Sequence, residues 1–117
     1  MGVKGCFFMI KTLTENENLA LLDFKRRLQA KFGNVEATLF GSKSRGDYDD
    51  YSDIDILVIL DKPSSNSIEE EIFDLGFDVE MEYNVILGII VYSKEAWNYL
   101  SGMSPFHKNV IEEGVAL

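Results

Sequence analysis

The chain has 117 residues and carries 11 Lys and Arg against 20 Asp and Glu, which gives a formal net charge of −9. This length fits one folded domain, and 46% hydrophobic with 26% charged residues argues against a disordered chain. One Cys and one His exclude an internal disulfide and a zinc site built from these residue types, and the acidic balance argues against direct binding of nucleic acid.

The N-terminal segment carries no pattern of a membrane span or a secretion signal. Its longest apolar run covers residues 6–10, which is far shorter than the roughly 20 residues that cross a bilayer. We therefore expect a cytoplasmic protein with no membrane contact and a single domain over residues 1–117. Residues 1–12 could form a flexible tail, and Met9 could be an alternative start.

The first expected elements are a helix and a short strand. Thr14 and Glu17 have the spacing of a capping box, in which each side chain accepts a hydrogen bond from the other residue's backbone. Apolar residues then recur at helical spacing until Gly33, which suits the position after a helix. These signals predict a helix over residues 15–32, followed by a β-prone run over residues 35–40.

The middle of the chain continues this alternation. Residues 54–60 form a continuous aliphatic run, which is typical of a strand covered on both faces. Ser67 and Glu70 suggest a second capping box ahead of an amphipathic helix over residues 68–83, and a third aliphatic run covers residues 85–92.

Two short helices complete the chain. Ser93 suits the cap of the first, and Pro105 opens the second, which ends at Gly114. Because helices alternate with strands along the sequence, we predict an α/β fold of three or more strands with helices packed on the sheet.

Two carboxylates stand at the entry to the second strand. Asp53 and Asp55 lie two residues apart, so both side chains point to the same face of the strand. Such a pair suits Mg²⁺, which takes oxygen ligands and keeps open positions for phosphate oxygens. The pair is our candidate for metal binding and catalysis; the alternative is two exposed acids at a strand end.

A basic Gly-Ser turn precedes this pair. Gly41 and Ser42 follow the first strand directly, and Lys43 and Arg45 lie beside them. Glycine allows a close approach of the backbone to a phosphate, and the serine adds a hydroxyl donor. We therefore assign nucleotide binding to Gly41, Ser42 and Arg45; the alternative is a tight turn with solvated bases.

Gly41-Ser42, ten further residues and then Asp53-x-Asp55 resemble the signature of the nucleotidyltransferase superfamily related to DNA polymerase β, and the length is similar to that of its minimal members. The resemblance implies a mixed sheet and a Mg²⁺-dependent reaction that moves a nucleoside monophosphate, AMP from ATP, onto an acceptor hydroxyl and releases pyrophosphate. It also implies a helical HEPN-type protein partner, commonly an RNase toxin, which such antitoxins neutralise by binding or by adding AMP.

The family's third carboxylate is missing from the expected strand. The resemblance puts it at or near Ile86, but residues 85–92 contain no acid. The remaining candidates are Asp78, Glu80 and Glu82 on the preceding helix. Transfer onto a protein hydroxyl is therefore one expectation, and the alternative is an inactive antitoxin that neutralises a HEPN-type RNase by binding.

An acidic ridge, defined by Glu70, Asp74, Asp78 and Glu82, recurs at every fourth position of the second long helix. It is either a solvated face or a docking surface for a basic partner. Modification of a small molecule is a further alternative, for which a homodimer could supply the acceptor pocket.

Overall fold

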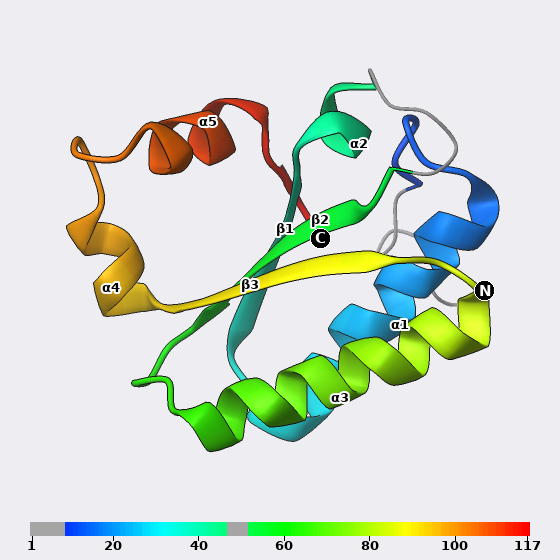
Figure 1. Cartoon of the computed structure of the whole chain (residues 1–117), viewed down its shortest axis with the longest axis horizontal. Coiled ribbons are helices and arrows are strands. Elements are labelled where there is room, and N and C mark those ends of the chain that lie inside the picture. Colours follow the sequence, from blue (N-terminus) through cyan, green and yellow to red (C-terminus); the bar gives the residue numbers. More distant parts are fainter. Residues whose placement is uncertain (1–8, 47–51) are drawn as a thin grey trace.

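The computed structural model describes residues 9–46 and 52–117, which form five helices and four strands (Figure 1). The order alternates helix and strand, as expected. In chain order the elements are α1 (Glu15–Phe32), β1 (Val35–Phe40), α2 (Ser42–Arg45), β2 (Ile54–Leu60), α3 (Asn66–Tyr83), β3 (Leu87–Ser93), α4 (Lys94–Tyr99), α5 (Pro105–Glu113) and β4 (Val115–Ala116).

The four strands form one mixed sheet in the order β3-β2-β1-β4. β1 runs antiparallel to β2 and to β4, whereas β2 and β3 are parallel. The predicted α/β class with a mixed sheet is confirmed. The two-residue strand β4 was not predicted, and it makes β3 and β4 the two edges of the sheet.

Helices cover the two faces of the sheet unequally. On one face α1 and α3 lie side by side (Figure 1), and Phe24 and Ile72 are buried there against the sheet. On the other face α4 and α5 bury Trp97 and Val110 against Leu57 and its neighbours in β2. This second layer covers the later part of β2, so the beginning of that strand keeps contact with solvent.

The two predicted capping boxes have different outcomes. The box at Thr14 and Glu17 is confirmed, with 3.0 Å between donor and acceptor in both hydrogen bonds. The box that would begin at Ser67 is wrong, because the hydroxyl of Ser65 accepts the hydrogen bond from the backbone of Ile68 and caps α3 instead. The segment ahead of α3 offers four good N-cap residues in a row, so the spacing alone does not single out one of them.

The third strand begins two residues later than predicted. Asn84 has a left-handed backbone with φ of 56°, and the backbone N–H of Val85 still donates to the carbonyl of Glu80 at 3.3 Å. The helix end therefore includes Val85, whereas the carbonyl of Ile86 already accepts a hydrogen bond from the backbone N–H of Ile54 at 2.9 Å. The carboxylate of Glu80 accepts a hydrogen bond from the N–H of Leu87 at 2.7 Å, where β3 starts.

Residues 9–14, which precede α1, are bound to that helix. The backbone N–H of Ile10 donates to the side-chain oxygen of Asn18 at 2.7 Å, and Leu13 is buried in the core. The other residues of the expected tail, 1–8, lie outside the described residues. Within the described ranges, no helix combines the length and the apolar character that crossing a bilayer requires.

A buried carboxylate joins α1 to α3. Asp23 accepts hydrogen bonds from Arg27 at 3.1 Å and from the hydroxyl of Tyr83 at 2.9 Å. The hydrogen bond from Arg27 lowers the pKa of Asp23 to about 2, helped by Arg26 and Tyr83 and opposed by burial. The ion pair of Arg27 with Glu82, at 2.8 Å, extends the same link along α3.

Candidate functional site

The two aspartates of the predicted site share one face at the entry to β2. Asp53 is exposed and Asp55 is half-buried, on the face that holds Leu57 further along the strand. The register places Asp55 opposite Phe40 of β1 and opposite Gly88 of β3. The carboxylate pair therefore lies between the turn that follows β1 and the first half of the edge strand.

Two glycines leave the space that the carboxylate of Asp55 occupies. A Cβ added to Gly41 would collide with Oδ2 of Asp55, and one added to Gly88 would lie 2.7 Å from Oδ1. Gly41 also has φ of 78°, which L side chains rarely adopt. Backbone from β1 and β3 thus confines Asp55 on both sides.

The charge of Asp55 is disfavoured in this position. Burial raises its pKa, Coulomb repulsion from Asp53 raises it further, and attraction by Arg45 lowers it in part. A cation bound by both carboxylates would reduce their repulsion. It would also replace the hydration that the carboxylate of Asp55 loses on burial. The pair of carboxylates therefore fits a hard divalent cation such as Mg²⁺.

The predicted Gly-Ser turn opens the short helix α2. The carbonyl of Gly41 accepts hydrogen bonds from the backbone N–H groups of Ser44 and Arg45, both at 3.1 Å. Within residues 9–46 and 52–117, no side chain caps the start of α2, so its first N–H groups are suited to an anion. Because Gly41 also touches Asp55, this turn and the carboxylate pair form one contiguous surface.

The two bases of the turn have different environments. Lys43 is almost fully buried, and its ammonium lies 2.7 Å from the carboxylate of Glu17 on α1. Arg45 is partly exposed, pairs with Glu113 at 2.8 Å, and is close enough to influence the ionisation of Asp55. Arg45 therefore stays a candidate for phosphate contact, whereas Lys43 holds the turn against α1.

The sequence of this chain matches the family model of the nucleotidyltransferase domain over residues 21–116. The chain belongs to the nucleotidyltransferase domain family. The match begins within α1 and ends in β4, so it includes every element that borders the aspartate pair.

Relatives of this nucleotidyltransferase domain agree with the match. A protein of Methanocaldococcus jannaschii, provisionally named a protein adenylyltransferase, is 38% identical over 104 residues, which are 87% of this chain and 98% of the relative. A crystal structure of a toxin-antitoxin with AMP-PNP superposes with a TM-score of 0.58 at 18% identity, covering 88% of this chain and 72% of that one. A mutant of the toxin-antitoxin MntA-HpeT gives 0.56 at 21% identity, covering 90% and 72%. The two structures support the fold alone.

The nucleotidyltransferase domain has no third carboxylate beside the aspartate pair among its described residues. Glu80 binds the backbone of Leu87, and Glu82 pairs with Arg27, so both are engaged at α3. Within residues 9–46 and 52–117, no three His, Cys, Asp or Glu side chains converge as a metal-binding group. Among the described residues, the candidate cation ligands are therefore the two carboxylates of Asp53 and Asp55.

Sequence reasoning missed three residues that shape the candidate site. Gly88 interrupts the third aliphatic run, and an isolated glycine in a strand is a known signal of close backbone approach. Glu17 was interpreted only as a capping residue, and its second oxygen binds Lys43. Glu113 has no local signal, because its contact with Arg45 joins residues far apart in the sequence.

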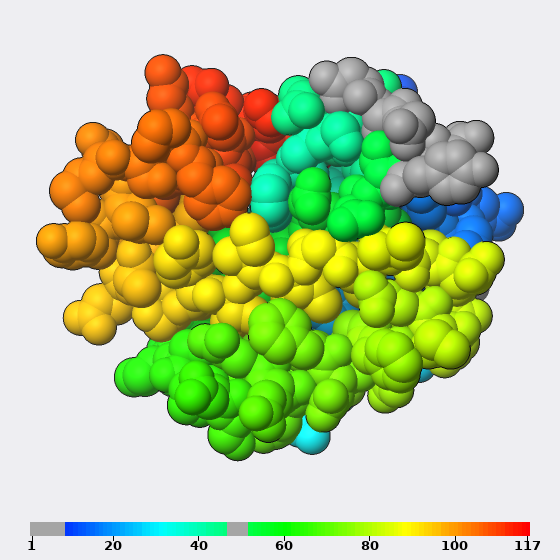
Figure 2. Space-filling view, viewed as in Figure 1, coloured from blue at the N-terminus to red at the C-terminus, as the bar shows by residue number. Residues whose placement is uncertain are grey.

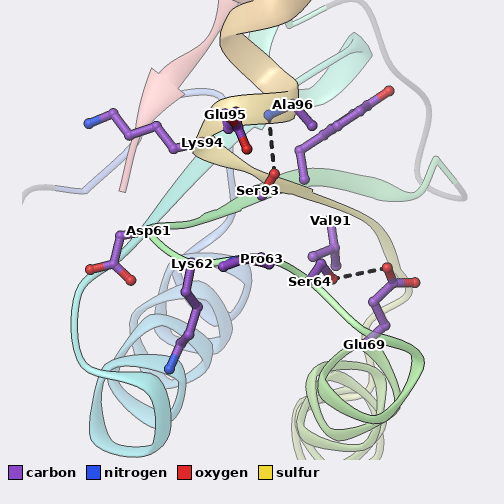
Figure 3. Close-up of a pocket in the computed structure, with 11 residues that line it drawn as sticks. Asp61, Lys62, Pro63, Ser64, Glu69, Val91, Ser93, Lys94, Glu95 and Ala96 are labelled. Carbon is purple, nitrogen blue, oxygen red and sulfur yellow. Dashed lines mark hydrogen bonds between the residues drawn. The ribbon is translucent and has the colours of Figure 1, made fainter.

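A hollow of about 480 Å³ lies at the end of β2 and β3 opposite the aspartate pair, between the loop after β2 and the start of α4 (Figure 3). Two of its charged side chains have partners: Glu69 accepts a hydrogen bond from Ser64 at 3.0 Å, and Lys94 lies 3.5 Å from Glu36. Figure 3 also shows the ammonium groups of Lys62 and Lys94 pointing away from one another. Glu69 and Lys94 are thus engaged within the chain, and the two ammonium groups of this hollow do not converge on one point.

Proposed function

We propose that this protein is a Mg²⁺-dependent nucleotidyltransferase that moves AMP from ATP onto a hydroxyl of a protein, with a HEPN-type toxin as the partner. The observation that carries the proposal is the contact between the backbone of Gly41 and the carboxylate of Asp55. It brings the turn suited to phosphate and the pair suited to a cation to one place. The 38% identical relative named for protein adenylylation supports the choice of AMP and of a protein acceptor.

Each site residue has a distinct role in this proposal. The backbone of Gly41 and the hydroxyl of Ser42 bind the triphosphate, and Arg45 adds positive charge beside them. Asp53 and Asp55 hold the cation, which neutralises charge on the transferred phosphoryl group when it is bound.

In the proposed transfer, the acceptor oxygen forms a bond to the α-phosphorus while the bond from that phosphorus to the bridging oxygen breaks. Pyrophosphate leaves, and the hydroxyl proton passes to solvent or to the partner. β3 carries no carboxylate to receive that proton, so we expect slow transfer unless the partner supplies a base.

The experiment is a calorimetric titration of ATP, with and without Mg²⁺, into the wild type, Asp55→Asn and Asp61→Asn. Asp61 is an exposed acid just after β2, at the other end of the same strand, and serves as the matched control. We expect Mg²⁺-dependent binding in the wild type and in Asp61→Asn, and a loss of about tenfold or more in Asp55→Asn. Equal binding by all three proteins would remove the aspartate pair from the site.

The second candidate function is an antitoxin that acts by binding alone. The lack of an acid on β3 favours it, because the proposed transfer has no base among the residues of that strand. The double variant Asp53→Asn/Asp55→Asn separates the two functions. If it still neutralises the partner toxin in growing cells, binding suffices; if neutralisation is lost while the two proteins still co-purify, transfer is required.

A further inference from the structure

The outward face of α3 carries an exposed row of large apolar side chains. Phe73, Phe77 and Met81 follow one another at every fourth residue and are 44%, 58% and 70% exposed. Ile72 and Val79 fill the core from the opposite side of the same helix. Single exposed apolar residues are ordinary, but a row along two helical turns is typical of an interaction surface.

Helix α3 is open on one face of the molecule. In Figure 2, α3 runs along the lower part of the face shown, in green to yellow-green, with no other segment in front of it. The helix therefore presents its outward side to any partner that approaches this face.

Uncompensated carboxylates run beside the apolar row. Glu70, Asp74 and Asp78 are exposed, and no ion pair joins them to the rest of the described chain. By contrast, two other acids of α3 have partners on α1: Glu71 pairs with Lys31 at 3.2 Å, and Glu82 pairs with Arg27. Of the acidic ridge defined from the sequence, the three members on the outward side are thus the ones available to another molecule.

We propose that this face of α3 binds a basic amphipathic helix of a partner protein. Apolar side chains of that helix pack on Phe73, Phe77 and Met81, and its Lys or Arg residues pair with the three free carboxylates. A row at every fourth residue forms the ridge that fits the groove of a second helix. Charge complementarity selects a basic partner, because α3 contains no Lys or Arg.

A second copy of this chain does not fit the same surface. A two-fold contact places the same patch on both sides, so the free carboxylates of one copy would face those of the other. The net charge of −9 adds to this repulsion.

The inference goes beyond the proposed function. α3 covers the sheet face that holds Ile72 and Phe24, whereas Asp53 and Asp55 lie on the other face. Binding at α3 therefore needs neither nucleotide nor transfer, and the loss of one activity does not imply the loss of the other.

The test uses a synthetic helical peptide of about 18 residues, with Leu in one stripe and Lys on both sides of it. It is titrated by calorimetry into the full chain and into Phe77→Ser/Met81→Ser. We expect the double variant to lose about tenfold or more in affinity. A peptide with Ser in place of Leu controls for charge alone, and Ile111→Ser, at an exposed apolar residue of α5, is the matched protein control.

Charge is tested with Asp74→Asn/Asp78→Asn, which should also weaken peptide binding, and the wild type should bind more weakly at high salt. Two outcomes overturn the proposal. One is peptide binding that is absent or unchanged by the α3 variants. The other is a wild-type dimer in sedimentation that Phe77→Ser/Met81→Ser abolishes, since a second copy would then be the occupant. ATP binding by the same variants separates this result from failure of the aspartate site.

Discussion

The ammonium of Lys43 lies 2.7 Å from one carboxylate oxygen of Glu17, and both side chains are largely removed from solvent. The other oxygen of Glu17 accepts the hydrogen bond from the backbone of Thr14 that caps α1. One carboxylate therefore connects the first turn of α1 to the turn that follows β1. The position of the candidate phosphate-binding turn thus depends on a helix that precedes it by two elements.

Glu17→Gln should destabilise the protein by about 3 kcal/mol, because it removes the carboxylate of a buried ion pair with Lys43. Gln can still accept the capping hydrogen bond from Thr14, so the loss reports on the ion pair. Urea unfolding at neutral pH measures it. Adding Lys43→Met to this variant should recover part of the stability, and a double variant weaker than Glu17→Gln would contradict this account.

Gly88→Ala should weaken Mg²⁺-dependent nucleotide binding without unfolding the protein. Its Cβ would lie 2.7 Å from Oδ1 of Asp55, so the carboxylate has to move. Calorimetry with ATP measures the effect, which we expect to be about tenfold. Gly76→Ala is the control: its Cβ would collide with the flexible end of Ile89 and make ordinary contact with Phe24, both on the opposite sheet face. Equal losses in both variants would point to general distortion of β3.

Asp55→Asn should stabilise the protein in the absence of divalent cations. The pKa of Asp55 is raised by burial and by Asp53, so the ionised group costs stability: its contribution is favourable below the unfolded pKa and is lost as pH rises through the folded pKa. Removal of the charge removes that cost at neutral pH. Thermal unfolding in EDTA measures the gain, and an unchanged or lower midpoint would contradict it.

Asp23→Asn should cost about 2 kcal/mol at neutral pH and much less in acid. The folded pKa of Asp23 is about 2, below its ordinary value of 3.8. Its contribution is therefore complete above the unfolded pKa and is lost as pH falls through about 2. Urea unfolding of both proteins between neutral and acid pH should give curves that converge toward low pH. A constant gap would show that packing, and not charge, carries the contribution of Asp23.

Local sequence signals predicted most of the helices and strands, because each signal was sufficient to identify its own element. Each of these signals depends on residues close together in the sequence: the capping box at Thr14, the aliphatic run of β2 and the proline at the start of α5. β4 escaped prediction because two residues show no periodicity. The antiparallel pairing of β1 with β2 cannot be derived from either strand by itself, and only the family resemblance implied a mixed sheet.

The sequence was enough to predict which side chains could bind a cation, but not the contacts that hold the neighbouring turn in place. The spacing of Asp53 and Asp55 determines that both share a face, because side chains alternate along a strand. The spacing cannot reveal that Lys43 turns inward to Glu17 while Arg45 turns outward to Glu113. Those directions depend on which distant carboxylate each base meets once the chain is folded.

The aspartate pair lies one strand away from the edge of the sheet, and the edge position next to Asp55 is a glycine. Among the described residues of the sheet, β3 alone separates Asp55 from this edge, so in the proposed function an acceptor on the surface of a large folded molecule would approach the carboxylates from the flank, across β3. In the proposed reaction, an approach across a sheet edge would give a bound nucleotide little protection from water. We expect a slow background release of AMP by hydrolysis, which should fall when a bulky acceptor closes the flank.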